Sequence, residues 1–123
     1  MLYAILCYDS ENVVASWTKE QDDAAMAKLD VAQQKLAAQG KLGPVARLMP
    51  THRARTLRKG REALVMDGPF AETKEQLLGF FVVDCATPQE ALDAAHELAK
   101  ASSSEGAYEI RPIAVFRPGS AGG

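Results

Sequence analysis

The sequence lacks several features that would point to familiar classes of function. It has two cysteines and two histidines among 123 residues, at no spacing typical of a zinc site, so we expect no metal. Lys and Arg number 14 against 16 Asp and Glu, and the resulting net charge of −2 argues against general nucleic-acid binding. No run of about twenty apolar residues is present, so no membrane span is expected. Gly-x-Ser-x-Gly and glycine-rich phosphate loops are also missing, which argues against hydrolases and nucleotide-binding proteins.

The composition that remains is typical of one globular domain. Hydrophobic residues make up 47% and charged residues 24% of the chain, and its length suffices for one core. No basic leader or cleavage site is visible, so we expect a cytoplasmic protein in which Cys7 and Cys85 are free thiols. The domain is expected over residues 1–117, followed by a flexible tail over 118–123.

Apolar runs and turn residues predict four sheet strands with a hairpin inserted between the second and the third. The expected sheet strands span 1–8, 42–49, 77–85 and 108–116. The hairpin pairs residues 54–58 with 62–66 around Lys59-Gly60.

Two helices are predicted from their starts. Thr18 and Thr87 each open a capping box, which predicts helices over 18–40 and from 87 to Lys100.

The segment 9–18 is expected to be a loop, and its tryptophan, Trp17, would cover the core edge, anchor an interface or form a ligand wall. With both helices on one face of the sheet, the apolar residues of the other face would be exposed to water. Such exposure costs a free energy of about 25 cal/mol per Å² of apolar surface. A second copy of the chain is therefore expected to cover that face.

The stretch between the third expected strand and the hairpin concentrates functional groups at one strand end. Gly68-Pro69 stops a strand, because proline has no N–H for the ladder and glycine admits unusual backbone angles. A turn followed by a short capped helix over 71–76 would explain these residues structurally, and a binding or catalytic site would explain them functionally. The ionisable or polar residues concerned are Asp67, Glu72, Thr73, Lys74 and Glu75.

The order Asp-Gly-Pro-Phe-Ala-Glu-Thr-Lys-Glu-Gln at 67–76, followed by Leu-Gly-Phe-Phe at 78–81, resembles the signature of the DGPF-domain branch of the YCII-related family. The similarity extends over roughly residues 1–116. It implies a ferredoxin-like α+β fold, βαββαβ with the inserted hairpin and an antiparallel sheet, that pairs into a homodimeric α+β barrel. It implies no reaction, since the family is largely of unassigned activity. Similar proteins are often associated with extracytoplasmic-function sigma factors. The resemblance therefore implies, as an alternative to small-molecule binding, that the protein has such a regulatory partner.

Acid–base chemistry without a metal or organic cofactor is the activity that these residues would permit. The candidate catalytic residues are Asp67, expected to be partly buried under Phe70, Glu72 across the turn, and His52, if the hairpin folds back beside them. The histidine–aspartate pair associated with shorter YCII-like proteins cannot be transferred, because residues 18–40 contain no histidine. The residues expected to bind a ligand are Gly68, Pro69, Phe70, Lys74, Arg58 and Phe81.

The basic residues of the hairpin leave two interpretations open. Cations at 53–61 discourage the edge-to-edge pairing of strands, and they would also suit an anion site shared with the Asp67 loop. The leading hypothesis is a homodimeric small-molecule-binding protein with a cleft near that loop. The alternative is a non-enzymatic regulatory or interaction module. A concave apolar pocket at the loop would favour the first, and a flat exposed apolar patch away from it would favour the second.

Overall fold

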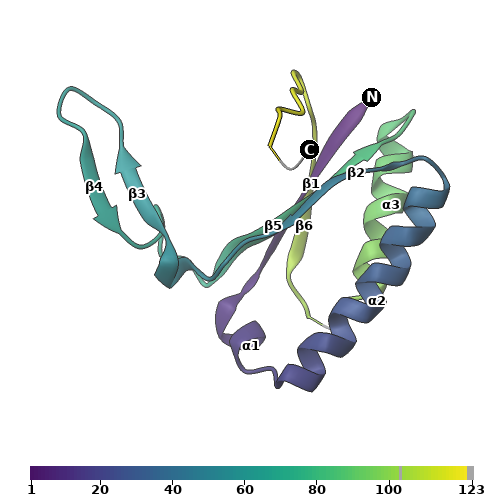
Figure 1. Ribbon diagram of the computed structural model, residues 1–123, viewed down its shortest axis with the longest axis horizontal. Coiled ribbons are helices and arrows are strands. Elements are labelled where there is room, and N and C mark those ends of the chain that lie inside the picture. The colour runs from purple at the N-terminus through teal and green to yellow at the C-terminus, as the bar shows by residue number, and fades with distance from the viewer. Residues whose placement is uncertain (103, 122–123) are drawn as a thin grey trace.

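Four antiparallel strands form the sheet that organises the protein (Figure 1). In the computed structural model, which describes residues 1–102 and 104–121, the strand order is β2-β5-β1-β6. With one helix after the first strand and one before the last, this is the predicted ferredoxin-like α+β arrangement, and the prediction is confirmed. The strands are β1 (Leu2–Ser10), β2 (Leu42–Arg47), β5 (Glu75–Asp84) and β6 (Ala107–Pro112).

Two helices, α2 (Lys19–Ala38) and α3 (Pro88–Lys100), lie side by side on one face of the sheet (Figure 1). Both begin where the sequence predicts. The Thr18 hydroxyl accepts a hydrogen bond from the Gln21 N–H at 3.1 Å, and the Gln21 side chain accepts one from the Thr18 N–H at 2.9 Å. The Thr87 hydroxyl likewise accepts from the Glu90 N–H at 3.1 Å. These bonds satisfy N–H groups that the first helical turn leaves without partners.

The core lies between the helix-facing side of the sheet and the two helices. Within α2, the one buried residue is Leu36, near the C-terminal end, whereas Leu29 is only partly buried. The N-terminal half of α2 therefore packs less tightly on the sheet than its C-terminal half. The core residues are Tyr3, Ile5, Leu36, Phe81, Val83, Cys85, Ala91, Ala94, Ala95 and Leu98.

The opposite face of the sheet carries no helix among the described residues (Figure 1). Leu6 and Phe80 are cross-strand partners on this face, and both are half-buried. After β6 the chain crosses to the same side, where the Ile113 N–H donates to the Leu2 carbonyl at 2.9 Å.

A separate two-stranded sheet, β3 (Arg55–Arg58) and β4 (Leu64–Asp67), projects away from the body of the protein (Figure 1). A short 3₁₀ turn, η1 (Thr51–Arg53), leads into it. The inserted hairpin is thus present, but β4 lies at 64–67 and not at 62–66, and five residues, 59–63, connect the two strands in place of the expected tight turn at Lys59-Gly60.

The prediction of a short helix over residues 71–76 is wrong. The segment 68–74 is a bent loop, and β5 begins at Glu75. The side chains explain this. The amide of Gln76 donates to the Ala71 carbonyl at 2.8 Å, and the Thr73 hydroxyl bonds the Glu75 carbonyl. Polar side chains thus bond the backbone carbonyls locally, in competition with a helix.

The loop expected over residues 9–18 is also only partly correct, because it contains a one-turn helix, α1 (Glu11–Ala15). Glu11 ties this helix to the start of η1. A helix that depends on a contact 40 residues away has no local signal in the sequence. At the other end of the chain, β6 stops at Pro112 and not at the expected residue 116.

Candidate functional site

A cleft lies between the N-terminal half of α2 and the helix-facing side of the sheet. It consists of an outer cavity of about 590 Å³, beside α1 and η1, and an inner cavity of about 150 Å³, between α2 and the strands. Binding sites for small molecules have volumes of roughly 300–1,000 Å³, so the outer cavity alone is of that size. The residues that line both cavities are Val14, Trp17, Asp22, Arg47 and Leu78.

Two small residues keep the inner cavity open. Ala25 lines the cavity from the side of α2. Gly79 of β5, the cross-strand partner of Cys7 and Arg47, lines it from the sheet. A Cβ on Gly79 would come within 2.4 Å of the Ala46 carbonyl oxygen, so close pairing of β2 with β5 requires glycine there.

The inner cavity is mainly apolar, and its two ionisable groups nearest the core are neutral. Burial raises the pKa of the Cys7 thiol to about 12. Burial also raises the pKa of Tyr108 to about 12, and the nearby Cys7 and Asp9 add to that effect. The Tyr108 ring packs edge-on against Phe81, with centroids 6.3 Å apart. At neutral pH the phenol is therefore a hydrogen-bond donor and not a base.

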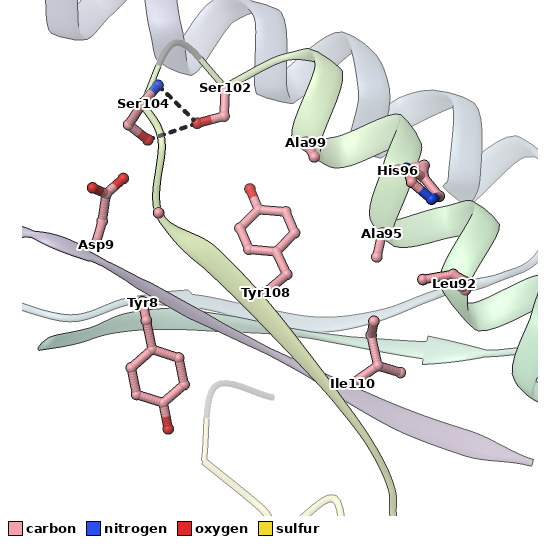
Figure 2. A pocket seen from close by; sticks show the side chains of 11 residues that line it. Tyr8, Asp9, Leu92, Ala95, His96, Ala99, Ser102, Ser104, Tyr108 and Ile110 are labelled. Atoms are coloured by element: carbon pink, nitrogen blue, oxygen red, sulfur yellow. Dashed lines mark hydrogen bonds between the residues drawn. The ribbon is translucent and has the colours of Figure 1, made fainter. Parts of the chain in front are cut away.

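A side cavity of about 200 Å³ joins the inner cavity beside Tyr108 (Figure 2). Figure 2 shows the Tyr108 ring standing between β6 and α3, with its hydroxyl toward the side chains of Ser102 and Ser104. Asp9 lies on the same side of the sheet, whereas Tyr8 points away from the helices. The Ser102 and Ser104 hydroxyl oxygens are 2.9 Å apart at the end of this cavity. The residues that line both cavities are Tyr8, Asp9, Ser102, Ser104 and Tyr108.

The outer cavity carries several polar and charged side chains on its wall. Glu11 accepts hydrogen bonds from the Thr51 N–H, at 2.7 Å, and from the Thr51 hydroxyl, which closes one wall. Arg47 forms an ion pair with Asp22 at 3.1 Å, and half of the Arg47 side chain remains exposed. An exposed ion pair contributes little to stability, so a polar ligand group can displace it at small cost.

The structure places two of the predicted site residues in the cleft. Phe81 is buried and lines the inner cavity, and His52 is exposed in η1 and lines the outer cavity. His52 thus lies with Glu11 and Arg47 and not with the loop that follows β4.

The other predicted site residues lie on the hairpin and the loop after it, and they line none of these three cavities. The Asp67 side chain is 92% exposed and pairs with Arg55 at 3.5 Å, so the expected partial burial under Phe70 is not found in the single chain. The Arg58 guanidinium lies over the ring of Phe70, 5.2 Å from its centroid. Glu72 and Lys74 are exposed.

Part of the signature has a structural role in this loop. Gly68 has φ +97°, a conformation that favours glycine, and its N–H donates to the Ala54 carbonyl at 2.8 Å. Its carbonyl accepts from the Thr56 hydroxyl at 2.9 Å. Pro69 beside it is half-buried. Gly68 and Pro69 thus fix the path of the chain at the base of the hairpin.

Sequence reasoning missed the polar residues of the cleft. Arg47 is the one charged residue of β2 and stands at the end of that strand. A single charge at the end of an apolar strand is a pattern in the sequence that could have indicated a binding residue. Glu11 and Tyr108 gave no such signal, because each is brought to the cleft by a distant element. Among residues 1–102 and 104–121, no three His, Cys, Asp or Glu side chains lie close enough together to hold a metal ion. None of the helices in the same ranges is long and apolar enough to cross a bilayer.

These features define a ferredoxin-like α+β protein with a helix–sheet cleft and a projecting hairpin. The family profile of the YCII-related domain matches residues 1–117, and the chain belongs to this family. An uncharacterized protein of Rhizobium meliloti (strain 1021) is 57% identical over 120 residues, which cover 97% of each chain.

Proposed function

We propose that the chain is a homodimeric small-molecule-binding protein whose ligand lies in the helix–sheet cleft. The observation that carries this proposal is that an outer cavity with several polar side chains and a more apolar inner cavity share the lining residues Trp17 and Arg47. Ligand sites are typically apolar with a few polar groups that fix orientation. The ligand expected here has an apolar or aromatic body, directed toward Phe81, and a polar group near Arg47.

An acid–base reaction without a cofactor is the activity we propose for this site. Among the candidate residues, His52 supports it best, because its exposed imidazole lines the outer cavity. Imidazole is well suited to proton transfer near neutral pH. Asp67 and Glu72 would join the site only where the hairpin of one copy approaches the cleft of another.

A regulatory or interaction module associated with an extracytoplasmic-function sigma factor is the second candidate. Exposed apolar side chains on the hairpin, away from the cleft, favour it. Titration with such a sigma factor from the same organism tests this candidate. Saturable binding that is lost when Leu64 is replaced by Ser would support it, and no binding would remove it.

Trp17 provides the test of the small-molecule site, because it is the single tryptophan and lines both cavities. A library of aromatic acids, aromatic amines and neutral aromatics is titrated while Trp17 fluorescence is followed. We expect at least one of these classes to give a saturable change. Ala25→Phe fills the inner cavity and is expected to weaken binding by roughly tenfold or more.

Ala27→Phe is the matched control, because Ala27 is an exposed residue of the same helix and lines none of the three cavities. It should bind like wild type, and far-ultraviolet circular dichroism confirms that both variants are folded. No saturable change with any class, or equal binding by Ala25→Phe and wild type, would contradict the proposed site.

A further inference from the structure

The hairpin of β3 and β4 exposes apolar side chains on both of its faces. Leu57 and Val65 are cross-strand partners on one face, and Leu64 and Met66 lie on the other. Leu57, Leu64 and Val65 each expose more than half of their surface. Phe70, in the loop after the hairpin, is 70% exposed.

Nothing in the described part of the chain packs substantially against this hairpin. β3 and β4 contact each other extensively, and no other helix or strand contacts either of them to a comparable extent. In Figure 1 the hairpin extends away from the sheet and from both long helices. A two-stranded hairpin alone is at best marginally stable in water, and large exposed apolar patches mark interaction surfaces. The hairpin therefore needs a partner.

The charges of the chain identify a second copy as that partner. The hairpin, residues 55–67, contains four of the 14 Lys and Arg residues and two of the 16 Asp and Glu residues. The rest of the chain therefore has ten basic against 14 acidic residues. Among these acids, Glu109 of β6 is exposed and is the cross-strand partner of Leu6 on the helix-free face. The basic hairpin of one copy is thus complementary in charge to the body of another.

The sheet of a second copy also offers an apolar surface. Its helix-free face contains Leu6 and Phe80, and no helix of the described residues covers it. In a two-fold dimer the same pair of surfaces is used twice, so both hairpins and both sheet faces are covered at once.

We infer that the hairpin is a dimer arm, which packs its apolar side chains against the helix-free sheet face of a second copy, with its arginines toward the acidic body of that copy. This inference rests on the homodimer of the proposed function. It adds that the dimer depends on residues of the hairpin, and that Asp67 and Glu72 of one copy lie against the second copy.

The test compares two exposed valines by light scattering coupled to size-exclusion chromatography. Val65 in the hairpin is 58% exposed and Val31 on α2 is 69% exposed in the single chain. We expect wild type and Val31→Asp to have the mass of a dimer at about 10 µM, and Val65→Asp to have the mass of a monomer. The corresponding increase in the dissociation constant is roughly 100-fold or more.

A second variant guards against misfolding of Val65→Asp. The pair of substitutions Leu57→Ser and Val65→Ser keeps the hairpin length and removes apolar surface from one face, and circular dichroism checks its fold. A folded dimer in both hairpin variants would overturn the arm and leave the homodimer standing. A wild-type monomer at the same concentration would overturn both. Neither result affects the titration of the cleft with aromatic fragments, so the two parts of the account fail separately.

Discussion

At the scale of one residue, Gly79 affects both the pairing of β2 with β5 and the space in the inner cavity. Its missing side chain lets the Ala46 carbonyl of β2 approach β5, and it leaves the floor of the inner cavity bare. The same glycine belongs to the Leu-Gly-Phe-Phe run at 78–81, which follows the stretch that resembles the DGPF-domain signature. Part of that pattern is therefore required by strand pairing, whatever ligand the cleft takes.

Gly79→Ala is expected to destabilise the protein. The added Cβ would stand 2.4 Å from the Ala46 carbonyl oxygen, so β2 must move away from β5. Overpacking of this kind typically costs about 1–3 kcal/mol in the free energy of unfolding. Urea denaturation of wild type and variant measures the difference. An unchanged midpoint would show that the strands separate without cost, contrary to the close pairing described here.

Tyr108 and Cys7 predict a loss of stability at alkaline pH. Burial raises the pKa of Tyr108 from 10.0 to about 12, and that of Cys7 from 9.0 to about 12. The folded state therefore keeps these protons at pH values where the unfolded state releases them. Their contribution to stability is complete below about pH 9 and declines as the pH rises toward 12. Thermal unfolding between pH 7 and pH 11 should show this decline, and Tyr108→Phe should reduce it. A pH-independent midpoint would contradict the burial of both groups.

Capping and apolar runs made most elements predictable. Thr18 and Thr87 carry their signals within four residues, and β1 and β5 are near-continuous apolar runs, which predict strands of a buried sheet. The helix over 71–76 was wrong because Thr73 and Gln76 bond the local carbonyls. α1 was missed because Glu11 holds it to Thr51, and no local pattern reports such a contact.

Glu11 is expected to hold α1 and η1 together at the mouth of the cleft. Glu11→Ala removes both bonds to Thr51, so the Thr51 amide should exchange its hydrogen faster and the protein should lose about 1–3 kcal/mol of stability. Hydrogen exchange followed by mass spectrometry or NMR measures the first effect. Glu20→Ala, at an exposed position of α2, is the control and should leave Thr51 unchanged. Equal protection of Thr51 in all three proteins would show that Glu11 does not hold this wall.

At the scale of the whole molecule, the ferredoxin-like fold followed from the resemblance of the sequence to its family, whereas the helix–sheet cleft was not predicted. Phe81 was expected to bind a ligand beside the Asp67 loop, whereas it lines the cavity between α2 and the sheet, because it belongs to the buried part of β5. Asp67, Glu72 and Lys74 were grouped because they are close in sequence, but their loop lies at the base of a projecting hairpin. The sequence carries no local signal for the direction of that hairpin. The residues of the cleft come from seven elements, β1, α1, α2, β2, η1, β5 and β6, and only the folded chain brings them together.

The most direct test of the account is a crystal structure of the protein with the aromatic fragment that gives the strongest change in Trp17 fluorescence. We predict electron density for the fragment between α2 and the sheet, with its ring toward Phe81 and its polar group near Arg47 and His52. Density for the fragment only at the Asp67 loop, or only on the helix-free face of the sheet, would contradict the claim that this cleft is the functional site.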